Sequence, residues 1–140
     1  MSFRMIVLLL VLVVVATGCA NKEKEASKVT LDEVIQEIQS EGPELISKGQ
    51  VNNDSDAFDG VKPNLFDIIS PVKPDSIYIY IFDSENDAKI AATKISGKFK
   101  VKTPTSIEGY LGRNALVIYF SKAGNVDKFD VELQTAMQKL

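Results

Sequence analysis

An unbroken run of 12 apolar residues, Met5 to Ala16, is followed by a polar stretch that separates it from the rest of the chain. A helix needs about 20 apolar residues to cross the hydrocarbon core of a membrane, so this run is too short for a permanent span. The residues after it are rich in lysine and glutamate and have no apolar period, which predicts a flexible tether over residues 19–28. We therefore expect the folded domain within the 112 residues from Val29 to Leu140, which are enough for one compact domain and too few for two.

The single cysteine of the chain, Cys19, stands just after that run, directly behind Gly18. With the basic residue Arg4, the apolar run and the small residues before it, this cysteine resembles the signal peptide of bacterial lipoproteins. The resemblance covers about the first 20 residues. Ala16 occupies the position three before the cysteine, where that family most often has leucine. The resemblance implies that residues 1–18 are a signal peptide and are removed.

It also implies that Cys19 carries lipid, with acyl chains such as palmitate, and becomes the new N-terminus. The expected location is the extracytoplasmic face of the cell membrane, with the lipid as anchor. The alternative is an ordinary secretory signal with an incidental cysteine, which would leave a free thiol outside the cell.

The charge balance bears on the partners of the chain. Once Arg4 is removed with the signal peptide, the remaining chain has 15 basic and 19 acidic residues, which give a formal net charge of −4. Because binding to nucleic acid depends on basic residues that neutralise phosphates, we expect no nucleic-acid partner. The expected partners are the membrane, through Cys19, and an envelope protein or wall polymer.

The first element after the tether is predicted to be a helix. Thr30 can cap its free backbone N–H groups, and Glu33, three residues later, can return a hydrogen bond to the cap. Gly42 and Pro43 predict its end. The apolar positions between these signals form one stripe: Leu31, Val34, Ile35 and Ile38.

Residues 44–75 are the hardest to assign. Leu45-Ile46 and residues 65–69 are candidate short strands, but glycines, prolines and an Asn-Asn-Asp sequence stand between them. We expect loops in this stretch, with an edge strand as the alternative.

The clearest strand is residues 77–82, with isoleucines on one face and aromatic residues on the other. A strand that is apolar on both faces usually lies centrally in a sheet. Ser84 and Asp87 then have capping-box spacing for a helix that runs to about Ser96 and ends at Gly97. Its buried stripe consists of small side chains and one isoleucine: Ala88, Ala91, Ala92 and Ile95.

The rest of the chain predicts a hairpin and a final helix. Residues 107–111 and 115–120 are strand-like, and a Gly-Arg-Asn turn separates them. Asn125 or Asp127 begins the last helix, which carries apolar residues at helical spacing. The order α-(β)-β-α-β-β-α predicts a single α+β domain over residues 29–140, a small two-layer sandwich with helices packed on an antiparallel or mixed sheet.

The chemistry available to an active site is limited. The chain has no histidine and one cysteine, so a Ser-His-Asp or Cys-His arrangement cannot be built, and we predict no catalytic residues, no cofactor and no metal. Two acidic groups are candidates for calcium loops. Helix capping explains the first better, and a solvated turn explains the second. The two groups are Asp83, Glu85 and Asp87, and Asp54, Asp56 and Asp59.

Two groups of side chains are candidates for contacts with a partner. Tyr78 and Tyr80 project from one face of the central strand, and Tyr119 lies beside them if the two strands pair in that sense. The alternative is that a helix covers these rings. A basic cluster could meet anionic headgroups or wall polymers, or could complement a helix end and a polar strand edge. It consists of Lys94, Lys98, Lys100 and Lys102.

Two functional classes stay open on this sequence. The first is a membrane-anchored, non-catalytic binding or interaction module with an unknown ligand, and it is favoured because the chain offers little from which to build an active site. The alternative is a carboxylate-dependent envelope hydrolase or transferase. In size and layout the chain is similar to small Gram-positive lipoproteins of unknown function, without a motif that assigns roles to residues.

Overall fold

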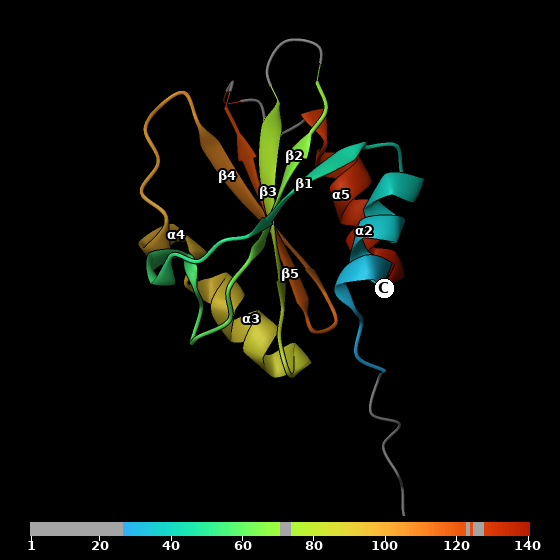
Figure 1. The fold of residues 1–140 in the computed structure, drawn as a ribbon, viewed down its shortest axis with the longest axis vertical. Helices are drawn as coiled ribbons and strands as arrows, with labels where there is room; N and C mark the ends of the chain where they lie inside the picture. The colour runs from blue at the N-terminus through green and yellow to red at the C-terminus, as the bar shows by residue number, and fades with distance from the viewer. Residues whose placement is uncertain (1–26, 71–73, 123, 125–127) are drawn as a thin grey trace, which may run out of the picture.

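The computed structural model describes residues 27–70, 74–122, 124 and 128–140. They form a five-stranded antiparallel sheet in the order β1-β2-β3-β5-β4, with helices on both faces (Figure 1). The α+β class and the antiparallel sheet are as predicted. The predicted signal peptide and Cys19 lie outside the described residues.

Helix α2 (Leu31–Ser40) begins with the predicted capping box. The backbone N–H of Glu33 donates to Thr30 Oγ1 at 3.3 Å, and the backbone N–H of Thr30 donates to the Glu33 carboxylate at 2.7 Å. These hydrogen bonds hold the pKa of Glu33 below its usual value. Val34 and Ile38 are buried, and α2 packs against the C-terminal helix α5 (Asp130–Lys139).

Two strands occupy the stretch for which loops were expected. β1 (Leu45–Gln50) is an edge strand and pairs with β2 (Asn64–Ile68), which lies inside the sheet between β1 and β3. The breaking residues stand in the connection, where a short 3-10 helix covers Asp54–Asp56, and not in the strands themselves. The expectation of loops is therefore wrong over β1 and β2, whereas the candidate strands at residues 45–46 and 65–69 and the alternative of an edge strand are confirmed.

The central strand is β3 (Asp75–Ile81), as predicted. Ile77 and Ile79 are fully buried on the face that α2 and α5 cover. In the register of β3 and β5, Ile77 lies opposite Tyr119 and Ile79 opposite Val117. Since directly paired residues share a face of the sheet, these four side chains belong to one core.

A second core fills the opposite face. Tyr80 of β3 and Phe82, which directly follows this strand, pack there with Ala88 and Ala91 of helix α3 (Glu85–Thr93) and with Phe58. The sheet therefore has a helical layer on each face, one layer more than the predicted two-layer sandwich (Figure 1). The physical reason is that β3 and β5 are apolar on both faces, and each face needs its own cover.

The helix predicted to run to Ser96 is interrupted. α3 ends at Thr93, and a short helix α4 (Ile95–Lys98) follows it. The predicted hairpin is confirmed as β4 (Ser106–Gly112) and β5 (Ala115–Ser121). Helix α5 begins at Asp130, and the predicted start at residues 125–127 lies outside the described residues.

Replacing Ile79 with aspartate should unfold the domain. Ile79→Asp would place a carboxylate, without a basic partner, in the core between β3 and the helices α2 and α5, which should cost about 4 kcal/mol or more. Urea denaturation followed by circular dichroism measures the loss. The matched control is Ile46→Asp on the edge strand β1, where the side chain is 49 % exposed and the change should cost less than about 1 kcal/mol. Equal effects at the two positions would contradict this picture of the core.

Candidate functional site

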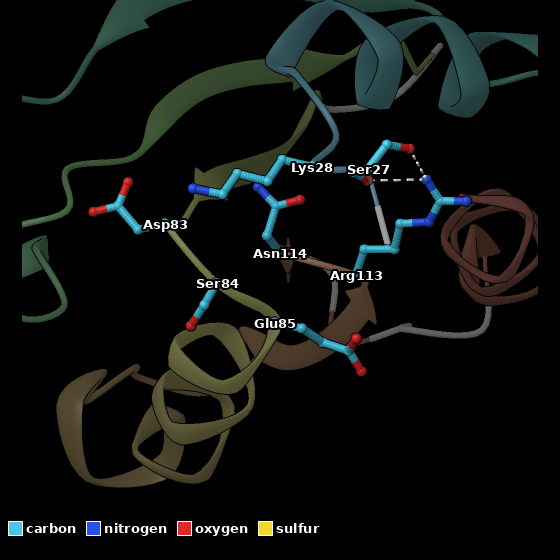
Figure 2. Close-up of a pocket in the computed structure, with 7 residues that line it drawn as sticks. All are labelled: Ser27, Lys28, Asp83, Ser84, Glu85, Arg113 and Asn114. Atoms are coloured by element: carbon cyan, nitrogen blue, oxygen red, sulfur yellow. Dashed lines mark hydrogen bonds between the residues drawn. The ribbon is translucent and has the colours of Figure 1, made fainter. Parts of the chain in front are cut away.

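A polar cleft lies where the N-terminal segment meets the turn between β4 and β5 and the start of α3 (Figure 2). Its volume is about 410 Å³. Lys28 and Arg113 bring positive charge to it, and Asp83 and Glu85 bring negative charge. In Figure 2 the side chains of Asp83 and Glu85 point away from each other, so the two carboxylates do not face a shared centre.

Asn114 is the buried residue of this cleft. Its Oδ1 accepts a hydrogen bond from the backbone N–H of Val29 at 2.7 Å. Its Nδ2 donates to the backbone oxygen of Val29 at 3.2 Å and to that of Phe82 at 2.9 Å. One side chain thus joins the N-terminal segment to the end of β3 and to its own hairpin turn.

Arg113 adds a second attachment. Its Nη1 donates to the backbone oxygen and to Oγ of Ser27, both at 3.1 Å (Figure 2). The backbone of Arg113 has φ 50°, which a non-glycine residue adopts only at some cost, in a two-residue turn that favours positive φ. The polar cleft is therefore the place where the chain enters the domain, held by two consecutive turn residues.

Several acidic residues of the two candidate calcium loops cap a helix or form ion pairs with lysines. Ser84 caps α3 by accepting from the Asp87 N–H, and Asp87 accepts from Ser84 Oγ at 2.6 Å. Glu85 pairs with Lys89 at 2.5 Å, which lowers its pKa. In the second group, Asp54 pairs with Lys62 and Asp59 with Lys94. Across the described ranges, no three acidic or thiol side chains are placed to hold a metal ion.

The predicted partner-binding tyrosines do not form an exposed face. Tyr80 is fully buried and donates a hydrogen bond to the backbone oxygen of Asp56 at 2.7 Å, and its burial raises the pKa of the phenol. Tyr119 is also fully buried, but on the opposite face, because its pairing with Ile77 places it beneath α5. Tyr78 is half-buried, with its ring centroid 4.9 Å from that of Phe120.

The hypothesis of a shared, exposed tyrosine face is wrong for two physical reasons, and the alternative that these rings are covered holds for Tyr80 and Tyr119. The register of β3 and β5 separates Tyr119 from Tyr78 and Tyr80, and the segment that carries Phe58 covers Tyr80. Neither the register nor the covering segment could be read from the alternation of the strand alone.

The basic cluster divides into two parts. Lys94 pairs with Asp59 at 2.9 Å, and the Lys98 amine lies 5.0 Å from the centroid of the Phe58 ring. Lys100 and Lys102 are exposed on the segment between α4 and β4, without an ion-pair partner among the residues described. Lys100 and Lys102 are therefore available to bind an anionic partner.

A groove that sequence reasoning missed lies beside β4, between this edge strand and the segment 95–101. Its volume is about 480 Å³, and its apolar walls come from Ile95, Phe99, Val101, Ile107 and Leu111. We call it the β4 groove. The sequence does show apolar residues in segment 95–101 and in β4, on either side of a polar stretch. That these residues lie against each other depends on the break between α3 and α4.

The buried carboxylate of the described residues is Asp75. It accepts hydrogen bonds from the Tyr119 hydroxyl at 2.8 Å and from the backbone N–H of Lys122 at 3.0 Å, and the Lys128 amine lies 3.9 Å away. The Tyr119 pKa is raised by burial and by this carboxylate. Asp75 therefore ties the ends of β3 and β5 together and faces the interior.

Comparison with family models, with curated proteins and with solved structures found no match for this chain. Within the part of the chain that the structure describes, no helix has both the length and the apolar character needed to cross a membrane.

Truncating Tyr80 should destabilise the fold and not merely a surface contact. Tyr80→Ser empties a fully buried ring site between β3 and Phe58 and should cost about 3 kcal/mol or more. Tyr80→Phe keeps the ring and removes the hydrogen bond to Asp56, and should cost about 1 kcal/mol. Thermal unfolding of both variants measures the difference. If Tyr80→Ser lowered the free energy of unfolding by less than about 1 kcal/mol, Tyr80 would be a surface contact and not a core residue.

Removing the side chain of Asn114 should loosen the attachment of the N-terminal segment. Asn114→Ala leaves buried backbone groups of Val29 and Phe82 without partners and should cost about 3 kcal/mol in urea denaturation. Arg113→Ala removes only exposed hydrogen bonds and should cost less than about 1 kcal/mol. Hydrogen exchange at the Val29 amide should rise in the first variant. An unchanged exchange rate would refute the role of Asn114 as the clamp.

Proposed function

We propose that this chain is a lipid-anchored protein of the extracytoplasmic face of the cell membrane and that its domain is a non-catalytic binding module. The lipid anchor is inferred from Cys19, the single cysteine, which follows a basic residue, a short apolar run and small residues. It stands eight residues before Ser27, where the described domain begins.

The position of the chain entry supports this proposal. Eight extended residues reach about 29 Å at most, so lipid on Cys19 would keep the domain close to the bilayer. Arg113 and Asn114 fix the N-terminal segment at the turn between β4 and β5. The end of the domain that carries this turn would then be the end nearest the membrane.

The state of the carboxylates favours binding over catalysis. Hydrolysis by paired carboxylates needs two such groups held on either side of one cleft. Asp75 is enclosed by its hydrogen bonds, and Glu85 and Asp59 pair with lysines. Since the chain also lacks histidine, a hydrolase or transferase would have to work with the remaining exposed acids alone. No contact among the residues that the structure describes favours that alternative.

Replacing Cys19 with alanine should release the protein from the membrane fraction. The acyl chains are attached to this residue in the proposal, and two or more chains are needed for stable anchoring. Cell fractionation with a high-salt wash, followed by mass measurement of the N-terminus, checks the result for Cys19→Ala against the parent chain. A variant that remained in the washed membranes after loss of its signal peptide would refute the anchor.

A further inference from the structure

The two edges of the sheet differ in how open they are to another strand. β1 carries Lys48 and a bulge between Ser47 and Gly49, where Gly49 has φ 87°. Charged lysine and bulges are the usual means by which natural edge strands resist pairing. β4 pairs with β5 in continuous register over seven residues, contains no lysine or proline, and has Glu108 as its one charge. The β4 edge therefore lacks the bulge and the lysine by which β1 resists pairing with another strand.

The outward backbone groups of β4 are available. Because Arg113 and Asn114 form a two-residue turn, hydrogen-bonded pairs alternate from Gly112 onwards. Ile107, Gly109 and Leu111 therefore direct their N–H and C=O groups away from β5. In the described ranges, no backbone hydrogen bond from outside the sheet reaches these three residues.

The same alternate residues line the β4 groove. Gly109 lets the neighbouring helix approach, since a Cβ there would lie 2.5 Å from Ile95 Cδ1. Val101 is 43 % exposed and Leu111 is 40 % exposed, so two large apolar side chains at the groove meet solvent. An added strand would bring its own alternate side chains against Ile107, Leu111 and Phe99 while its backbone bonded to β4.

The charge beside the groove indicates what kind of segment fits. Phe99 and Val101 alternate along the chain with Lys100 and Lys102, which bring two positive charges to the segment that forms one wall of the groove. Lys98 lies over the Phe58 ring instead, and Glu108 of β4 is the charged residue that lines the groove itself. Lys100 and Lys102 have no acidic partner among the described residues. A partner with carboxylates next to its apolar residues would satisfy them.

The place of this segment in the fold disfavours a lipid surface as the partner. In Figure 1 the segment between α4 and β4 lies at the upper left, whereas the chain enters the domain at the lower right. A tether from Cys19 that joins the described domain at Ser27 would bring the entry end to the bilayer and leave the segment between α4 and β4 on the far side.

We propose that the β4 groove binds an extended acidic polypeptide segment as an added antiparallel or parallel strand. Alternate apolar side chains of the segment occupy the groove, and its carboxylates meet Lys100 and Lys102. This inference rests on the proposed function in taking the domain as a binding module, but it does not depend on the lipid anchor.

The test uses the isotope-labelled full-length chain in dodecyl maltoside and two capped probe peptides. One contains Glu-Val repeated four times, and the other contains Lys-Val repeated four times. In amide NMR titrations the acidic peptide should shift the signals of Ile107, Gly109 and Leu111, and the basic peptide should bind at least about tenfold more weakly. The combined variant Lys100→Gln, Lys102→Gln should weaken binding of the acidic peptide by about tenfold or more.

Two matched variants separate the edges. Leu111→Ser removes an exposed apolar side chain from β4 and should weaken binding of the acidic peptide by about tenfold. Ile46→Ser removes one from β1 and should leave binding unchanged. Dispersed amide spectra confirm that each variant is folded before its affinity is measured.

Several results would overturn the proposal. Shifts confined to β1, equal affinity for both peptides, or no shift at about 1 mM acidic peptide, a concentration that fills even a weak site, would each do so. Shifts at β4 that depend on protein concentration without peptide would assign the edge to a second copy of the chain. Shifts produced by phosphatidylglycerol but by neither peptide would assign the lysines to lipid. None of these results changes the membrane fractionation of Cys19→Ala, so the two proposals fail separately.

Discussion

The structure depends on the fact that β3 and β5 are apolar on both faces. Ile77 and Ile79 face one side of the sheet, and Tyr80 and Phe82 face the other. β5 is buried along almost all of its length. Neither strand can leave a face in water without exposing large apolar side chains, so the flanking segments must supply two covers. The N- and C-terminal helices cover one face, and the middle of the chain covers the other.

The two covers differ in their packing. α2 and α5 pack against each other as well as against the sheet, and Lys139 of α5 pairs with Glu41 just after α2. On the opposite face, small side chains of α3 allow close approach to the sheet, and the aromatic residue Phe58 fills the space that the short helices leave over Tyr80. A helix interrupted at Lys94 is sufficient there because a loop completes the layer.

Much of the fold could be predicted because its signals are local. The capping box at Thr30 and Glu33, the central strand and the hairpin turn at Arg113 and Asn114 each depend on residues close in sequence. The sequence offers β2 only as a candidate strand, because its partners are β1 and β3, and five residues flanked by prolines carry a weak pattern. The side of the sheet that Tyr119 faces could not be predicted, since it follows from a pairing register between strands about 40 residues apart.

The candidate site was missed for a related reason. Sequence patterns pointed to rings and charges as separate groups, whereas the β4 groove arises only when the segment after α4 turns back along the edge of the sheet. Once both faces of a sheet are covered, its edges are the remaining places where backbone groups can bind a partner. β1 resists a partner with a bulge and a lysine, and β4 has neither. This asymmetry, together with the exposed Lys100 and Lys102 on the segment that forms the apolar wall, is the physical basis of our proposal that β4 accepts an added strand.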